Sequence, residues 1–577
     1  MRERLARLAV LCATLVAFTT PAAAQVYTGR IDITVTDSTG AILPGATVEL
    51  TGPQNATAVS DSKGEVHFLN LAPGTYAVTA KLQGFGDYNN TNVPVVAGGG
   101  VPLKIALAVG GVTQTVDVSA ESPVIDPKRM TTSTNVTQEQ LQEIPSARDP
   151  WVVLQTVPGI IVDRVNVGGA ESGQQSGYQA KGASSGDNTW TIDGIAITDM
   201  AALGSSPTYY DFDMFQEMNV TTGGAALENA TPGVGLNFVL KSGSNTPRGS
   251  ARIYYEDEGM QANNMPDDLK ASLGGATGKG NRINLYKDYG GELGGPIWKD
   301  RLWAWGAYGK TDVTLITLAG APDKTLLENS SFKATGQISQ ALRGGFTFFR
   351  GDKLKFGRSA SPTRPPETTH NQSGPTSLYK GEANLVVGNN LFLTGRYGFV
   401  DGGFQLTPQG GLDTPRYQDD SGVYRGSYTH YETVRPQWTA SFDGNLFRGN
   451  HEVKFGYSWR RADVDSSSLV PGYGGVNGVL TTHDGYPNMI ADIYVANNLT
   501  ATTATYQSLY VGDTITWDRL TMNLGVRWDH AGAGITGATQ QGSSLVPDLL
   551  PDLTATPMDN VITNSAVSPR VGVTYAL

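Results

Sequence analysis

Histidine and carboxylate side chains are the groups in this sequence most able to do chemistry, and their spacing argues against a catalytic or metal site. The six histidines stand apart, without a second histidine, a cysteine or a carboxylate at metal-ligand spacing in a helix or hairpin. The acidic pairs Asp267 and Asp268, and Asp419 and Asp420, stand among turn-forming residues. They are expected to be solvated loop charges, with a surface cation site as the alternative. We predict no catalytic residue, no metal site and no cofactor.

The glycine-rich stretch 223–235 is the remaining candidate for ligand chemistry. It does not follow the strand-to-helix pattern of a dinucleotide-binding turn, so phosphate binding is not expected there. The net charge is -11, from 42 basic and 53 acidic residues, and the sequence has no basic run. A nucleic-acid partner is therefore disfavoured.

The elements that carry these residues are expected to be strands and turns. The 577-residue chain has 71 glycines, 16% charged residues and 9% aromatic residues. Glycine is costly inside helices, and the aromatic content does not fit a disordered chain. The sequence therefore favours a mainly β protein with more than one domain.

The first 24 residues have the pattern of a secretory signal peptide. Arginines precede the apolar run 8–18, and Ala22 and Ala24 form a small-residue cleavage site before Gln25. The apolar run is too short to span a bilayer, and a short anchor helix is the alternative. The single cysteine, Cys12, lies in this segment, so the mature chain is expected to have no disulfide.

Long alternating strands occupy the C-terminal half. In the segment 449–461, Val453, Phe455, Tyr457 and Trp459 alternate with Glu452, Lys454, Gly456, Ser458 and Arg460. The same two-faced pattern recurs in 379–387, 391–400, 437–446 and 520–529. Segments of about ten residues with one apolar face are typical of tilted transmembrane strands. The alternative is the core of a soluble sandwich.

Tryptophans near strand ends support the membrane interpretation. Aromatic rings prefer the bilayer interface. Six tryptophans are expected to form such girdles: Trp298, Trp303, Trp305, Trp459, Trp517 and Trp528.

The N-terminal region 25–109 has short strands separated by turns. The runs "TDSTGAILPGATVEL" and "LNLAPGTYAVTAKLQGF" resemble the carboxypeptidase regulatory-like domain. That resemblance implies a transthyretin-like β-sandwich, an accessory domain without protease residues.

The region 122–247 resembles the plug domain of TonB-dependent outer-membrane receptors of the Oar-like branch. The resemblance is carried by "IDGI" and "LKSGSN", and its motif residues here are Asp193, Gly194, Lys241, Gly243 and Asn245. "GELGGPIWKDRLWAWGAYG" and "LTMNLGVRWDH" resemble barrel segments of the same receptors. The resemblance implies an α+β plug inside an antiparallel transmembrane β-barrel of the 22-strand type over 248–577.

The barrel region is short for that family. It has 330 residues and about a dozen strand patterns, and the sequence ends in Ala576 and Leu577 without a final aromatic residue. Twenty-two strands of about ten residues would leave too little chain for the long loops. Either the sequence is a truncated piece of a longer receptor, which we favour, or it forms a smaller barrel.

The linker 110–121 contains a candidate TonB box. In the family, the protein TonB captures a short extended segment before the plug by strand addition. The segment "QTVDVSA" resembles this box, with Gln114, Thr115, Val116, Asp117 and Val118 as expected contacts. An ordinary last strand of the sandwich is the alternative for these residues.

Substrate contacts are expected on outward plug loops and long extracellular loops. The candidates are Asn188, Trp190, Tyr209, Tyr210 and Asp211, each of which could instead pack the plug against the barrel wall.

Three functions compete. The resemblance implies an outer-membrane importer of a bulky or scarce nutrient (a carbohydrate, peptide or chelate) that has TonB, lipid and an extracellular ligand as partners. The alternatives are an adhesion protein that uses the barrel as an anchor and a secreted soluble β protein. An anchor needs no plug, which favours the importer.

Overall fold

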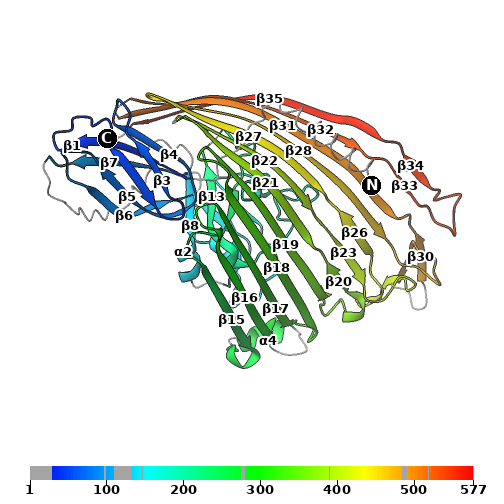
Figure 1. Ribbon diagram of the computed structural model, residues 1–577. Helices are drawn as coiled ribbons and strands as arrows, with labels where there is room; N and C mark the ends of the chain where they lie inside the picture. The colour runs from blue at the N-terminus through cyan, green and yellow to red at the C-terminus, as the bar shows by residue number, and fades with distance from the viewer. Residues whose placement is uncertain are drawn as a thin grey trace, which may run out of the picture.

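The computed structural model describes residues 29–575 apart from 97–98, 110–131, 145–146, 225–226, 264, 274–279, 389, 484–489 and 518. Figure 1 shows three β-rich units: a small domain at one end, a large curved sheet, and a compact unit on its concave side. We call them the sandwich, the large sheet and the plug.

The sandwich packs two sheets, in strand orders β4-β1-β7 and β3-β2-β5-β6. Alternate residues of β1 point inward, so that Ile31, Ile33 and Val35 are buried in its core. The turn after β1 is held by Asp37, whose Oδ1 accepts hydrogen bonds from the backbone N–H groups of Thr39 and Ala41. The strands are β1 (Gly29–Asp37), β2 (Thr47–Thr51), β3 (Ala56–Val59), β4 (Glu65–Leu71), β5 (Gly74–Lys81), β6 (Tyr88–Val95) and β7 (Gly100–Leu107).

The plug is built on a five-stranded sheet in the order β12-β11-β14-β13-β8. Its helix α2 begins with a capping box formed by Thr137 and Gln140, and α3 is capped by Asp149. The plug strands are β8 (Thr132–Thr137), β9 (Ile160–Val162), β10 (Tyr178–Ala180), β11 (Thr189–Ile192), β12 (Ile195–Ala196), β13 (Phe215–Gly223) and β14 (Gly235–Leu240). The helices are α2 (Gln138–Glu143), α3 (Pro150–Leu154), η1 (Ser185–Asp187) and η2 (Phe212–Met214).

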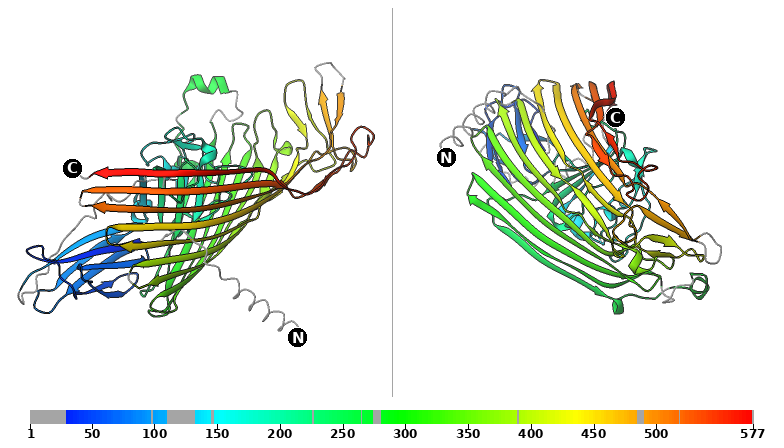
Figure 2. Two further views of the ribbon diagram at one scale, coloured as in Figure 1. Left: turned by 90° about the horizontal axis from the view of Figure 1, so that it is seen from above. Right: turned by 90° about the vertical axis from the view of Figure 1, so that its right-hand side faces the viewer.

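The large sheet has 15 strands, of which the long ones pair with their neighbours as antiparallel hairpins. They run side by side, with short turns at the end that faces the sandwich and longer loops at the other (Figure 2). The long strands are β15 (Arg248–Asp257), β16 (Arg282–Trp298), β17 (Leu302–Ile316), β18 (Pro322–Gln337), β19 (Leu342–Arg358), β21 (Thr376–Val387), β22 (Leu391–Asp401), β27 (Gln437–Arg448), β28 (His451–Leu469), β31 (Asn498–Trp517), β32 (Leu520–Ile535) and β35 (Met558–Tyr575).

Short elements extend the loop end. Strands β20 (His370–Ser373), β23 (Gly403–Pro408) and β26 (His430–Val434) connect β19 to β28. The others are β24 (Arg416–Gln418), β25 (Tyr424–Gly426), β29 (Val479–His483), β30 (Ile490–Tyr494), β33 (Ala538–Gln540), β34 (Leu553–Ala555), η3 (Glu258–Met260), α4 (Asp267–Leu273) and η4 (Pro366–Thr368). In the described residues β15 pairs only with β16 and β35 only with β32, so the sheet is open between them.

The burial pattern of the large sheet is the reverse of a soluble sheet. On β31, Ser508 is 3% exposed and its neighbour Leu509 is 55% exposed. On β27, Asp443 and Asn445 are buried, whereas Trp438 on the other face is only half-buried. At these positions the polar side chains face the plug side of the sheet and the apolar side chains face outward. This arrangement confirms the predicted class: a β-sandwich, an α+β plug and a partial antiparallel sheet of the transmembrane barrel type.

Two of the six tryptophans expected at a bilayer interface are elsewhere. Trp303 and Trp305 are buried, and their indole N–H groups donate to Asn245 Oδ1 (2.8 Å) and Glu292 Oε2 (3.0 Å). The expectation was wrong for this pair because β17 directs both rings toward the plug. Trp298 and Trp517 are on the exposed face, as expected. No helix in the described part of the chain is long and apolar enough to cross a membrane.

Candidate functional site

The apolar core of the plug is continuous with the inner wall of the large sheet. Within the plug, the ring of Phe238 lies 4.5 Å from that of Phe215 and 5.8 Å from that of Trp190. The same buried cluster includes four residues of the large sheet: Trp305, Phe349, Leu378 and Val400. The two units therefore share one core.

Asp193 of the predicted plug motif joins the plug to the wall. It lies in the turn between β11 and β12 with a φ of 45°, followed by Gly194 with a φ of 80°. Its Oδ1 accepts a hydrogen bond from the backbone N–H of Leu240 (3.0 Å), and its Oδ2 lies 2.8 Å from Lys333 Nζ on β18. Both partners are buried, so removing either one would leave an uncompensated charge.

The predicted motif residues of "LKSGSN" also contact the wall. Lys241 Nζ lies 2.6 Å from Glu292 Oε1. A Cβ on Gly243 would lie 2.4 Å from the carbonyl oxygen of Ala304, so glycine is needed for this close approach. Asn245 accepts from the Trp303 indole and donates to Asp300 (2.7 Å). All five motif residues thus lie at or beside the contact between plug and sheet.

The five predicted substrate contacts lie mainly inside the plug. Asn188 donates to the backbone oxygen of Tyr178 (2.8 Å) and accepts from the backbone N–H of Val234 (2.9 Å). Trp190 is fully buried and donates to the oxygen of Gly204 (2.9 Å). Their role in substrate binding stays a prediction.

Tyr209, Tyr210 and Asp211 complete this predicted set at the contact with the wall. Tyr210 is buried against Phe238, and burial raises the pKa of Tyr209 to about 12. Asp211 lies 2.5 Å from Arg252 of β15, yet burial raises the pKa of its carboxyl. Their substrate role also stays a prediction. Of the five residues, only Asn188 lines the cavity described next.

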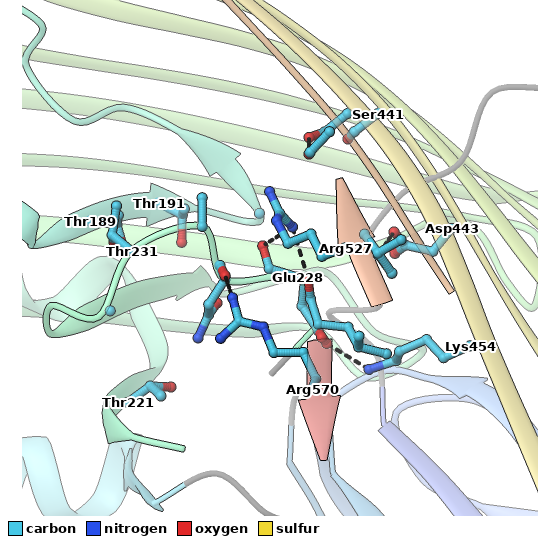
Figure 3. Close-up of a pocket in the computed structure, with 18 of the residues that line it drawn as sticks. Thr189, Thr191, Thr221, Glu228, Thr231, Ser441, Asp443, Lys454, Arg527 and Arg570 are labelled. Carbon is cyan, nitrogen blue, oxygen red and sulfur yellow. Dashed lines mark hydrogen bonds and ion pairs between the residues drawn. The ribbon is translucent and has the colours of Figure 1, made fainter. Parts of the chain in front are cut away.

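A cavity of about 1010 Å³ lies between the plug and strands β27, β28, β31, β32 and β35. Figure 3 shows the plug residues Thr189, Thr191, Thr221 and Thr231 and, across the cavity, Ser441 and Asp443 of β27. Hydroxyl and amide groups predominate among its polar lining residues, which also include Asn219, Asn237, Asn445, Ser458, Ser508, Thr514 and Asn523. Such a surface can form hydrogen bonds with a hydrated polar solute.

A plug loop, 227–229, crosses this cavity and is held by basic side chains of the large sheet (Figure 3). Glu228 Oε1 lies 2.6 Å from Lys454 Nζ. Arg527 donates to the backbone oxygens of Leu227 (2.8 Å) and Glu228 (3.0 Å), and Arg570 donates to that of Asn229 (3.2 Å). Burial opposes ionisation of Glu228, but Lys454 outweighs this effect and lowers the pKa of the carboxyl.

A gap in the wall receives the side chain of Leu227. Gly512 and Gly525 are paired across β31 and β32. A Cβ on either glycine would lie 2.3 Å or 2.5 Å from a methyl group of Leu227, respectively. The absence of both side chains therefore makes room for the loop.

Sequence reasoning missed the 227–229 loop because it considered the stretch only for phosphate binding. The sequence does contain a signal for this loop, on the strands of the large sheet that face it. Lys454 occupies a polar position in an alternating strand, and so does Arg527. A cation on the polar face of such a strand points to an acidic or carbonyl partner inside the barrel.

The candidate TonB box, Gln114, Thr115, Val116, Asp117 and Val118, lies outside the described residues. The predicted signal peptide lies outside them as well. Within the described ranges, no group of three or more histidine, cysteine, aspartate and glutamate side chains could hold a metal ion.

Four family descriptions match the chain in order. Residues 30–108 match the carboxypeptidase regulatory-like domain, and 126–235 match the TonB-dependent receptor plug domain. Residues 316–577 match the TonB-dependent receptor-like β-barrel, and 239–338 match an outer membrane β-barrel domain. The family is one of receptors and transporters rather than enzymes, and these matches give no support to the adhesion alternative.

One curated relative is the TonB-dependent transporter Oar of Myxococcus xanthus. It is 27% identical over 259 residues, which cover 43% of this chain and 23% of the relative. The chain thus aligns with about a quarter of that protein's length.

Solved structures share the fold. The outer membrane transporter YddB from Escherichia coli has a TM-score of 0.54 at 14% identity, over 76% of this chain and 58% of that one. The ferric citrate transporter FecA has a TM-score of 0.52 at 12% identity, over 78% and 61%. The copper transporter OprC has a TM-score of 0.52 at 11% identity, over 77% and 60%. The plug and barrel matches together cover 372 of the 577 residues, and they show that this chain belongs to the TonB-dependent receptor family.

Proposed function

We propose that the chain acts as a TonB-dependent active transporter of the outer membrane, importing a bulky or scarce nutrient. The observation that carries the proposal is the occupied interior of the large sheet. The plug shares an apolar core with the wall and is tied to it by the buried pair Asp193–Lys333. A plug fixed in this way blocks passive flow, so transport needs energy from outside the barrel.

TonB is the proposed source of that energy. The linker between β7 of the sandwich and β8 of the plug contains the candidate box around Thr115, Val116 and Val118. An extended segment there can pair with a strand of TonB through backbone hydrogen bonds, and force on it would act directly on the plug.

An outer-membrane location is supported by the outward apolar face. Leu509 and Tyr397 are more than half exposed, and each follows a buried polar residue, Ser508 or Arg396. An apolar outer face of this kind is stable in contact with the acyl chains of a lipid bilayer. Residues 1–24, as a signal peptide, would direct the chain out of the cytoplasm.

The cargo is proposed to be a carbohydrate or peptide in preference to a charged chelate. The cavity lining is rich in hydroxyl and amide groups. Three of its five lysine and arginine side chains pair with a carboxylate: Arg30 with Glu452, Lys454 with Glu228, and Arg527 with Asp529 (2.7 Å). A polyhydroxylated or peptide solute can exchange hydrogen bonds with these groups without displacing an ion pair.

The test is substitution in the candidate box. Val116→Pro removes a backbone donor and restricts φ, so crosslinking of the receptor to TonB should fall to the background level. Glu121→Pro, in the same linker beyond the box, is the matched control and should crosslink like the wild type. Unchanged crosslinking of Val116→Pro would defeat the assignment of the box.

A further inference from the structure

The sandwich contacts one short turn of the large sheet through an aromatic stack. Phe447 is the last residue but one of β27, just before this turn. Its ring stacks on that of His67 of β4, with 5.5 Å between the centroids and 17° between the planes. The Arg30 guanidinium lies over the same ring, 4.9 Å from the centroid. An aromatic side chain at the tip of the large sheet is thus enclosed by two side chains of the sandwich.

A charge network lies beside that ring. Arg30 donates to both oxygens of Glu452 on β28, at 2.5 Å and 2.8 Å, and to Asp32 at 3.0 Å. Asp32 in turn lies 2.8 Å from His67 Nδ1, which orients the imidazole against Phe447. The Arg30 and Glu452 side chains are only 18% and 17% exposed. A planar, two-point pair of this kind selects geometry as well as charge.

The contact between the sandwich and the large sheet extends to both sides of the Arg30–Glu452 ion pair. Lys63, in the turn before β4, reaches the turn after β27: its amine lies 3.5 Å from where a Cβ on Gly449 would be. In the other direction, Arg30, Asn70 and Gly100 line the cavity between the plug and the large sheet. The sandwich therefore forms part of the wall of that cavity.

We propose that the sandwich is a docking domain for the β27–β28 turn of its own chain, and that docking makes it the floor of the cavity. The docking surface consists of Arg30, Asp32, Lys63 and His67, and its target is Phe447, Gly449 and Glu452. The turn is one of the short turns, which face the periplasm in outer-membrane barrels. On the proposed orientation, which rests on the proposed function, the docked domain covers the route from the cavity to the periplasm.

The test uses a photoreactive lysine analogue at position 63 of the full chain in outer-membrane vesicles. Mass spectrometry of the irradiated protein should find a crosslink between the sandwich and a peptide containing 447–451. This readout does not depend on TonB or on any cargo, so its failure would be distinguishable from failure of the transport proposal.

Charge reversal tests whether the ion pair holds the domain. Arg30→Glu and Glu452→Arg should each lower the crosslink yield about tenfold, because each places like charges at a partly buried contact. The double variant should restore most of the yield. Lys104→Glu, which reverses an exposed cation of the same sandwich sheet, should leave it unchanged.

Three results would overturn docking: no crosslink to the turn in the wild type, an unchanged yield in both single variants, or an equal loss in Lys104→Glu. Glu452→Arg guards against misfolding of the sandwich, because its substitution lies in the large sheet. A double variant with a yield as low as the single variants would count against the pairing of Arg30 with Glu452.

Discussion

Several charged side chains on the inner face of the large sheet each form an ion pair with one carboxylate of the plug. Lys333 pairs with Asp193, Arg435 with Asp199 at 2.5 Å, and Lys454 with Glu228. Breaking a fully buried pair by removing one partner typically costs 3–5 kcal/mol, far more than breaking a surface pair. The Lys454 and Glu228 side chains are 32% and 21% exposed, so their pair is the one expected to open at the lowest cost.

Glu228→Gln should loosen the 227–229 loop. The substitution removes a charge-assisted contact of about 1.5 kcal/mol, which corresponds to about a tenfold increase in opening. Amide hydrogen exchange of peptides covering 227–234 measures this directly. Glu139→Gln, at an exposed position of α2, is the control and should exchange like the wild type.

The pH dependence of that exchange has a defined sign. The folded-state pKa of Glu228 is lowered from 4.5, so its contribution is complete above about pH 4.5 and is lost as pH falls through the folded value. After correction for intrinsic exchange, the wild type should lose protection of the loop below pH 4.5, whereas Glu228→Gln should change little. Identical profiles for the two proteins would contradict the ion pair.

At the scale of elements, the charged side chains that contact the plug are positioned by hairpins with one polar and one apolar face. Period-two alternation predicted the strands that became β21, β22, β27, β28 and β32, and it placed Lys454 and Asp443 on the polar face. It also predicted lipid on the apolar faces, but it gave no direction at the start of β17, where Leu302, Ala304 and Gly306 alternate with Trp303 and Trp305 and both faces are nonpolar. Trp303 and Trp305 were misplaced for that reason. The partners of the inward charges could not be predicted either, because Asp193 and Lys333 lie far apart in the sequence.

The glycine pair on β31 and β32 yields a prediction about packing between elements. Gly525→Ala places a methyl group about where Leu227 lies, so the 227–229 loop should be displaced and its exchange should rise several-fold. Gly381→Ala is the matched control, since a Cβ at that strand position meets no atom within 4 Å. Equal exchange in the two variants would mean that Leu227 does not occupy the gap.

At the scale of the whole molecule, each of the three units has a different place in the structure. The large sheet presents apolar side chains on its outer face, the plug lies on its concave side (Figure 2), and residues of the sandwich line part of the cavity between plug and sheet. Turn chemistry and strand periodicity are local properties, and they predicted short strands in the N-terminal region and long two-faced strands in the C-terminal half. The plug was predicted only from the resemblance of its motifs to a known family. The contact of Arg30 with Glu452 was beyond such reasoning, since it joins residues 422 positions apart.

The central claim is that acyl chains surround a sheet whose interior is blocked by the plug. Spin labels placed one at a time along 507–512 of β31 in membrane vesicles test it, by collision with oxygen, which concentrates in lipid, and with a water-soluble nickel chelate. The account predicts a period of two: high oxygen and low nickel accessibility at Leu509 and Val511, and low accessibility to both reagents at Ser508 and Tyr510. Nickel accessibility at Leu509 and Val511 as high as at an exposed loop residue such as Leu549 would contradict it.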